Sequence, residues 1–96
     1  MQRVVDGKRY DTRTATLIAS DEYWDGHNMD RGGRNTYLYR TLRGSYFTVT
    51  TTCWQGERDM LTPVTEAEAV ELYTYALPEH RVDFEAAFPN VTVEDA

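Results

Sequence analysis

The fold of this chain is constrained most by two runs rich in Thr, Tyr, Phe, Val and Trp, at residues 36–41 and 46–54. These residue types favour strands, and the segment Leu42-Arg43-Gly44-Ser45 between the runs is typical of a turn. The two runs therefore predict a β-hairpin. Pairing across the turn places Leu38 opposite Val49 and Arg40 opposite Phe47.

This pairing gives the hairpin two faces, because side chains alternate along a strand. We expect the core face to hold Leu38, Phe47, Val49, Thr51 and Cys53. The opposite face then holds Tyr37, Tyr39, Tyr46, Thr48, Thr50, Thr52 and Trp54. Its aromatic members, Tyr37, Tyr39, Tyr46 and Trp54, define an aromatic face. Either a second layer of the fold packs on this face, or a protein partner binds it.

Turn and capping signals predict shorter elements on both sides of this hairpin. Asp6-Gly7 joins residues 4–5 to residues 8–10 as a tight hairpin. Asp11 is a candidate cap for a helix over residues 12–19, where Ala15, Ile18 and Ala19 recur at helical spacing. Residues 60–64 are expected to add a third strand at a sheet edge, where Pro63 is tolerated.

The carboxy-terminal third of the chain predicts helices. Thr65-Glu66-Ala67-Glu68 is a capping box. The apolar stripe that follows is expected to lie on the core face of the sheet, and it consists of Val70, Tyr73 and Leu77 with Ala69 and Ala76. Pro78 ends or kinks this helix, and it suits the first turn of another over residues 79–88, whose candidate core residues are Val82, Phe84 and Phe88. Residues 89–96 are expected to form a flexible acidic tail.

These elements predict a single α+β domain over residues 1–96. It consists of a small antiparallel sheet of three to five strands, a short amino-terminal helix, and one or two carboxy-terminal helices packed on one face. Ninety-six residues allow only one domain. Residues 20–35 show no periodicity, and a loop of that length in so small a domain is usually functional or mobile.

The charge is unevenly distributed along the chain. The net charge is −6, yet residues 1–58 carry nine Lys and Arg against seven Asp and Glu, while residues 59–96 carry one Arg against nine acids. This balance argues against a nucleic-acid binder and favours a basic partner. The lack of a bilayer-length apolar run, of a hydrophobic signal segment and of a second cysteine beside Cys53 predicts a cytoplasmic protein.

No constellation predicts catalysis, a cofactor or a metal site. Cys53 with His27 or His80 shows no spacing typical of a nucleophile and its base or of zinc ligands. Gly26, Gly32 and Gly33 lack the motif of a phosphate-binding loop. The acids of the same loop, Asp21, Glu22, Asp25 and Asp30, are out of register for a calcium loop.

The acids of the predicted helices are the candidate binding residues. They are Glu66, Glu68, Glu71, Glu79, Asp83 and Glu85, and Arg81 is the only cation among them. A solvated helix face commonly carries acids, but it normally mixes them with Lys and Arg. Like charges at helical spacing are mildly unfavourable, so the stability of the helix does not explain why these acids are present. A surface of one sign steers association with a basic surface.

Three blocks of the sequence form a recurring pattern. The first is Gly7-Lys8-Arg9-Tyr10-Asp11-Thr12 with Thr14-Ala15 and Leu17-Ile18. The second is Leu38-Tyr39-Arg40-Thr41 with Gly44 and Tyr46-Phe47, and the third runs from Pro63 through Glu66 to Ala69. Together they resemble a family of short bacterial, archaeal and phage-borne proteins found in mobile elements. This chain departs from the family pattern between residues 20 and 35 and between residues 48 and 58.

Small acidic proteins from such elements include anti-CRISPR inhibitors, several of which occupy the DNA-binding surface of a CRISPR effector as DNA mimics. The resemblance therefore implies an inhibitor that acts in the cytoplasm of a bacterial host, and it supplies no catalytic residues. We expect a non-enzymatic monomer or homodimer whose acids bind and block a basic protein surface, with no direct contact with nucleic acid or membrane. The alternative is a regulatory or interaction module that uses the aromatic face, as a homodimer.

Overall fold

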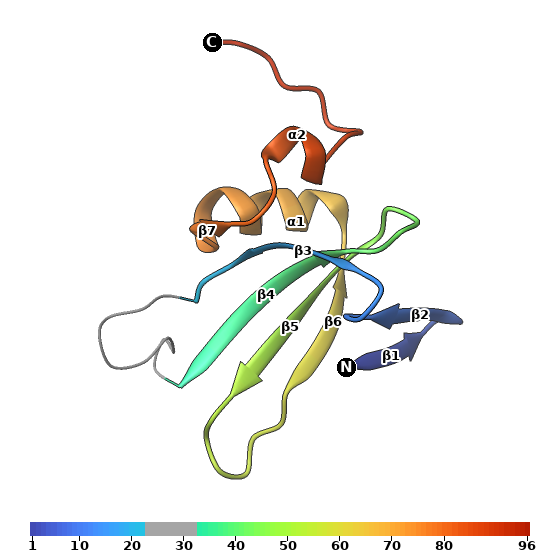
Figure 1. Ribbon diagram of the computed structural model, residues 1–96, viewed down its shortest axis with the longest axis vertical. Helices are drawn as coiled ribbons and strands as arrows, with labels where there is room; N and C mark the ends of the chain where they lie inside the picture. Colours follow the sequence, from blue (N-terminus) through green and yellow to red (C-terminus); the bar gives the residue numbers. More distant parts are fainter. Residues whose placement is uncertain (23–32) are drawn as a thin grey trace.

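The computed structural model describes residues 1–22 and 33–96, which form an α+β fold with two antiparallel sheets (Figure 1). Strands β1 (Gln2–Val5) and β2 (Lys8–Asp11) make a two-stranded sheet. A five-stranded sheet in the order β6-β5-β4-β3-β7 contains β3 (Thr16–Ser20), β4 (Arg34–Arg40), β5 (Tyr46–Thr52), β6 (Met60–Val64) and β7 (Glu79–His80). The helical segments are α1 (Glu66–Glu71), the π-helical η1 (Leu72–Ala76) and α2 (Phe84–Ala87). The predicted class is confirmed, but these seven strands in two sheets exceed the predicted number.

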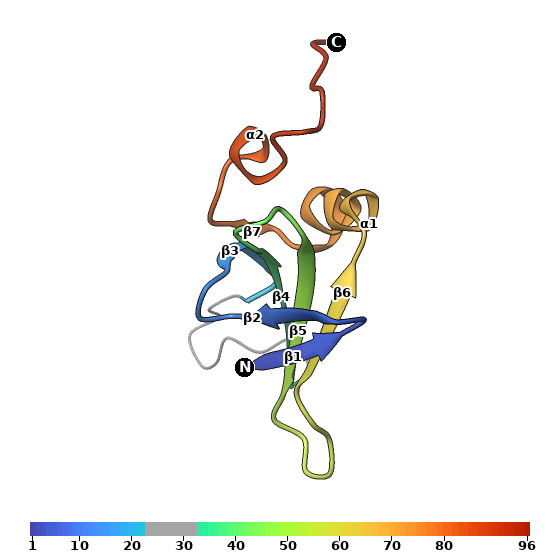
Figure 2. The same cartoon turned by 90° about the vertical axis from the view of Figure 1, so that its right-hand side faces the viewer.

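The amino-terminal hairpin forms as predicted. Asp6 and Gly7 have φ angles of 52° and 75°, the left-handed conformation that a two-residue hairpin turn requires. Figure 2 shows this hairpin crossing in front of the larger sheet, and Tyr10 packs there in one apolar cluster with Phe47. The hairpin therefore covers one face of the five-stranded sheet.

The predicted helix over residues 12–19 is wrong. Asp11 starts only a single turn, in which its carbonyl oxygen accepts a hydrogen bond from the N–H of Ala15 at 3.1 Å. The chain then extends as β3 and pairs with β4 through a bulge between Leu17 and Ala19. The bulge brings the neighbours Ile18 and Ala19 into the same buried cluster. Sheet pairing thus overrides an apolar spacing that imitated a helix.

The central hairpin is confirmed, but its predicted register is wrong by one residue. Tyr37 pairs with Val49, Leu38 with Thr48, and Arg40 with Tyr46. The N–H of Thr41 donates to the carbonyl of Ser45 at 2.8 Å, so the loop contains three residues, the last of which is Gly44 with a φ angle of 86°. A three-residue loop closed by a left-handed glycine shifts β5 by one position and reverses the face of each of its side chains.

The shifted register builds a core on each face of the sheet. Leu38 lies with Tyr46 in a cluster under the helices, which also contains Ile18, Ala19, Ala69, Tyr73, Leu77, Ala87 and Phe88. Phe47 and Val49 lie in the other cluster, with Tyr10 and Leu61, under the amino-terminal hairpin. The predicted core face of Leu38, Phe47 and Val49 is therefore wrong. The sheet separates residues that we expected to pack together.

The edge strand and the capped helix follow the prediction. Among the strands that the structure describes, β6 pairs only with β5, and it includes Pro63. The Thr65 side chain accepts a hydrogen bond from the N–H of Glu68 at 3.1 Å, and the Glu68 carboxylate accepts one from the N–H of Thr65 at 3.0 Å. Of the predicted stripe, Ala69, Tyr73 and Leu77 are buried and Val70 is half-buried, whereas Ala76 is exposed. The last turn is π-helical, with the N–H of Leu77 bonded to the carbonyl of Leu72.

The predicted helix over residues 79–88 is shorter than expected. After Pro78 the chain is extended, and Glu79 and His80 pair as β7 with Ser20 and Ala19 of β3. Helix α2 begins only after Asp83. Phe88 is fully buried, while Val82 and Phe84 are partly buried against the same cluster, so the predicted core residues are confirmed.

Residues 89–96 form no helix or strand and extend away from α2 (Figure 1). Val91 packs against the helix-side cluster, and the other residues of this segment are exposed. Across the part of the chain that the structure describes, no helix has the length and apolarity needed to cross a membrane.

Candidate functional site: an acidic helical surface

The six predicted binding acids lie on helix α1, on the edge strand β7 of the five-stranded sheet, and on α2 with its cap. Glu66, Glu68 and Glu71 belong to α1, Glu79 belongs to β7, and Asp83 and Glu85 begin α2. Glu66 is partly buried and the other five are exposed. Both views show α2 beside α1 (Figures 1 and 2), so the acids of the two helices lie in one layer, and Glu79 lies on the edge strand that joins them; we call these six residues the acidic helical surface.

Aromatic contacts hold α2 against this layer. The Tyr73 ring packs edge-on against Phe84 and Phe88, and its hydroxyl donates to the carbonyl of Val82 at 2.8 Å. From the sheet, the Tyr46 hydroxyl donates to the carbonyl of Ala87 at 2.8 Å. A helix of four residues has little stability of its own, so these contacts fix the position of Asp83 and Glu85.

The acidic helical surface carries no compensating cation. None of its six carboxylates lies within 4.0 Å of a Lys or Arg nitrogen of the described residues. Arg81, the one cation after residue 59, instead faces Glu22, with 3.9 Å between Nη2 and Oε1. Glu68 has a structural task as well, because the backbone N–H of Thr65 lowers the pKa of its carboxyl. The negative charge is therefore exposed to an approaching partner.

A shallow cleft of about 350 Å³ lies within this surface. Glu68 and Glu71 line it together with Val64, Leu72, Tyr75 and Ala76. Tyr75 is 85% exposed, which is unusual for so large a ring. In the sequence, Glu68, Glu71 and Tyr75 recur at helical spacing, but that spacing gives no signal for the apolar floor that Val64 and Leu72 form. That floor depends on where β6 ends and α1 begins.

The predicted aromatic face is wrong, because the observed register divides its members. Tyr46 is buried under the helices and stacks on Phe88, with ring centroids 5.2 Å apart. Tyr39 stacks on Phe47 on the opposite face of the sheet, at 5.1 Å. Trp54 follows the end of β5 and is 53% exposed. Tyr46 and Tyr39 therefore lie on opposite faces of the sheet, whereas Tyr37 and Tyr39, two residues apart on β4, keep a common face.

Tyr37 is used inside the fold. Its hydroxyl donates to the Glu22 carboxylate at 2.7 Å, and burial together with this acid raises the pKa of Tyr37 to about 12. The neighbouring Asp21 carboxylate accepts the backbone N–H of Thr36 at 2.8 Å. Two acids of the loop at residues 20–35 thus support the sheet. Asp25, Gly26, Asp30 and Gly32 lie outside the described residues, and so does His27.

Of the residues considered for catalysis, the structure describes Cys53 and His80, which lie on different elements. Cys53 is exposed just beyond β5, so its predicted place in the core is wrong. His80 lies on β7, where its ring stacks on Tyr73 at 3.8 Å and its Nε2 is 2.7 Å from the carbonyl oxygen of Tyr73. Residues 1–22 and 33–96 contain no group of three or more His, Cys, Asp and Glu placed to hold a metal ion.

Comparison of this chain with protein-family models, with curated proteins and with solved structures found no match. Its function must therefore be inferred from its own residues. The acidic helical surface is the strongest candidate, because its carboxylates form no ion pair with a described residue that would stabilise the helices carrying them.

Proposed function

We propose that this protein is a non-enzymatic inhibitor that binds and blocks a basic protein surface. The observation that supports this is the set of six carboxylates on the acidic helical surface, none of which forms an ion pair with a described residue. A solvated surface usually carries both signs of charge, because opposite charges at helical spacing stabilise helices and like charges do not. Recognition of a cationic partner accounts for a surface that carries only negative charge.

The partner that we propose is the DNA-binding face of a CRISPR effector, with the carboxylates in the place of DNA phosphates. Two things support this choice. One is the sequence resemblance to short mobile-element proteins, and the other is that a DNA-binding face carries cations that bind negatively charged phosphates. Glu71, Glu79 and Glu85 would contact the cations of the effector. Tyr75 would add apolar contact area beside them, and exposed Tyr is enriched at the energetic centres of interfaces. Such a protein acts in the cytoplasm of its bacterial host.

Displacement of DNA from an effector tests the proposal. Purified, guide-loaded CRISPR effectors are bound to a fluorescent target duplex, and the anisotropy of the duplex is followed as this protein is added. We expect displacement of the duplex, and we expect it to weaken as the salt concentration rises, because salt screens exposed charges. If the protein displaces DNA from none of the effectors, the assigned partner is contradicted.

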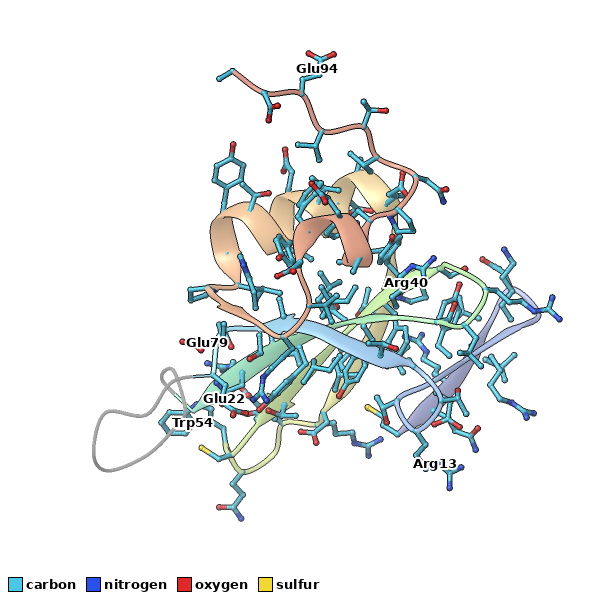
Figure 3. The ribbon with its side chains drawn as sticks, turned by 45° about the horizontal axis from the view of Figure 1, so that its top comes forward. Arg13, Glu22, Arg40, Trp54, Glu79 and Glu94 are labelled. Atoms are coloured by element: carbon cyan, nitrogen blue, oxygen red, sulfur yellow. The ribbon has the colours of Figure 1, made fainter. Side chains whose placement is uncertain are left out.

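Charge reversal locates the contact. The variant Glu71→Lys with Glu85→Lys should lose inhibition, and neither side chain forms a hydrogen bond or ion pair with another described residue, so the fold should survive. The matched control is Glu94→Lys with Asp95→Lys. It changes the net charge equally, but on the exposed terminal segment, where Figure 3 shows Glu94 far from Glu79. Equal inhibition by both variants would contradict the assignment of the acidic helical surface.

A further inference from the structure

A second cleft is lined by basic residues of the amino-terminal half of the chain. It has a volume of about 650 Å³ and opens between the tip of the β1–β2 hairpin and the turn that joins β4 to β5. The hairpin lines it with Gly7, Lys8, Arg9 and Tyr10, and the turn lines it with Thr41, Leu42, Arg43 and Ser45. Thr14 completes the wall. Two segments that are more than thirty residues apart in sequence therefore meet at one site.

The cations of this cleft have no acidic partner. Lys8, Arg9 and Arg43 are exposed, and none lies within 4.0 Å of a carboxylate of the described residues. Asp11, which follows them on β2, does not line the cleft and faces Arg13, with 3.5 Å between Oδ1 and Nε. Three cationic residues thus line a cleft whose lining contains no acidic residue, and Lys8, on the face of β2 that carries Tyr10, is turned toward the larger sheet.

A fourth guanidinium lies against the same turn. A Cβ atom added at Gly44 would stand 3.3 Å from Nη2 of Arg40, so the glycine leaves room for this side chain. The Nε of Arg40 is buried and forms no hydrogen bond with any residue that the structure describes. Figure 3 shows Arg40 at the base of this turn, well separated from Glu79 and Glu94. Arg40 does not line the cleft, but its charge lies against the same turn and pairs with no carboxylate of the described residues.

The chemistry of this lining fits phosphate groups. Arg and Lys nitrogens donate charge-assisted hydrogen bonds to phosphate oxygens, and the Thr14, Thr41 and Ser45 hydroxyls are further donors. Three cations on two separate walls match a ligand with more than one phosphate better than a single phosphate. We infer that this cleft binds the polyphosphate chain of a small molecule.

Size and charge favour a small ligand over a nucleic acid. A volume of about 650 Å³ lies within the range of small-molecule sites. Electrostatic interactions are screened beyond about 8 Å at physiological ionic strength, so a small ligand in the cleft responds mainly to its local cations. A long nucleic acid would also meet the acidic helical surface of a chain whose net charge is −6. Tyr10 and Leu42 supply apolar area next to the cations.

Calorimetric titration of the full chain tests the inference, with pyrophosphate, ATP and adenosine as probes. We expect pyrophosphate and ATP to bind and adenosine alone not to bind. ATP binding tighter than pyrophosphate would support the inference and add a contact with the nucleoside, while equal affinities would support it with the phosphate chain as the whole ligand. Absence of binding by both phosphates at millimolar concentration would overturn it, as would tighter binding of a single-stranded oligonucleotide than of ATP.

Variants locate the site. Lys8→Ala and Arg43→Ala should each weaken pyrophosphate binding at least tenfold, and both side chains are exposed, so the fold should be retained. The control is Arg58→Ala, which removes an exposed cation that does not line the cleft and should change the affinity less than twofold. Equal weakening by all three variants would overturn the assignment, because it would reflect net charge alone. The Glu71→Lys, Glu85→Lys variant should still bind pyrophosphate, which separates this site from the proposed inhibitory surface.

Discussion

Replacement of Tyr46 by Phe tests whether one buried hydrogen bond holds α2 on the sheet. Tyr46 is 3% exposed, and its hydroxyl donates to the carbonyl of Ala87, which is itself 1% exposed. The substitution keeps the stacked contact with Phe88 but leaves the buried carbonyl without its donor. Loss of such a bond with an orphaned acceptor costs about 1.5 kcal/mol of the free energy of unfolding.

For a domain of this size, that loss lowers Tm by roughly 6 to 12 °C. Urea unfolding followed by circular dichroism measures the free energy, and hydrogen exchange shows where the fold loosens. We expect faster exchange at the amides of Ala87 and Phe88, which form the turn of α2.

Tyr75→Phe is the matched control. This side chain is 85% exposed, and it forms no hydrogen bond with another described residue, so its replacement should change the free energy of unfolding by less than about 0.5 kcal/mol. An equally small effect at Tyr46 would refute the reasoning. It would also contradict the register of β5, because a shift of one residue would turn the Tyr46 side chain away from the helices.

Three further substitutions have defined outcomes. Thr65→Ala removes the hydroxyl of the capping box and should cost about 1 kcal/mol in urea unfolding, whereas Thr65→Ser should retain most of the stability. Since the pKa of Tyr37 is raised from 10.0 to about 12, its neutral form stabilises the fold below pH 10.0, and this contribution is lost as the pH rises toward 12. Tyr37→Phe should therefore remove the latest phase of phenolate absorbance at 295 nm, and an unchanged titration curve would contradict this. Gly33→Ala should displace the Trp54 indole, whose Nε1 would lie 2.3 Å from the new Cβ, and shift its fluorescence. Gly56→Ala, with the same positive φ but open space, should not.

Local signals in the sequence identified the elements whose determinants lie within a few residues. Asp6-Gly7 fixes the first hairpin through its own backbone preference, and Thr65 with Glu68 fixes the start of α1 through two hydrogen bonds across one turn. The acids of the helical layer are also visible in the sequence, since their charge does not depend on the fold. Whether they are exposed and unpaired depends on where Arg81 points, and only the structure provides that.

The failed predictions share a cause: each is a choice between close alternatives that composition and spacing do not decide. The segment at residues 42–45 suits a turn of three residues or of four, and the left-handed Gly44 selects three. That single residue reversed the face of β5 and divided the predicted aromatic face. The bulge at Ile18 gave β3 an apolar spacing typical of a helix. The basic cleft could not be predicted at all, because Lys8 and Arg43 meet only after two hairpins have folded.

Both borders of the five-stranded sheet are poor templates for further strands. On one side, β7 has two residues, and the N–H of Arg81 already occupies the carbonyl of Ile18 at 2.8 Å. On the other side, Pro63 offers β6 no N–H, and Nη1 of Arg3 donates to the carbonyl of Leu61 at 2.7 Å. Exposed strand edges invite polymerisation between identical chains. These borders therefore disfavour pairing of the larger sheet with the sheet of a second copy, and contacts with other molecules are left to side chains rather than to free strand edges.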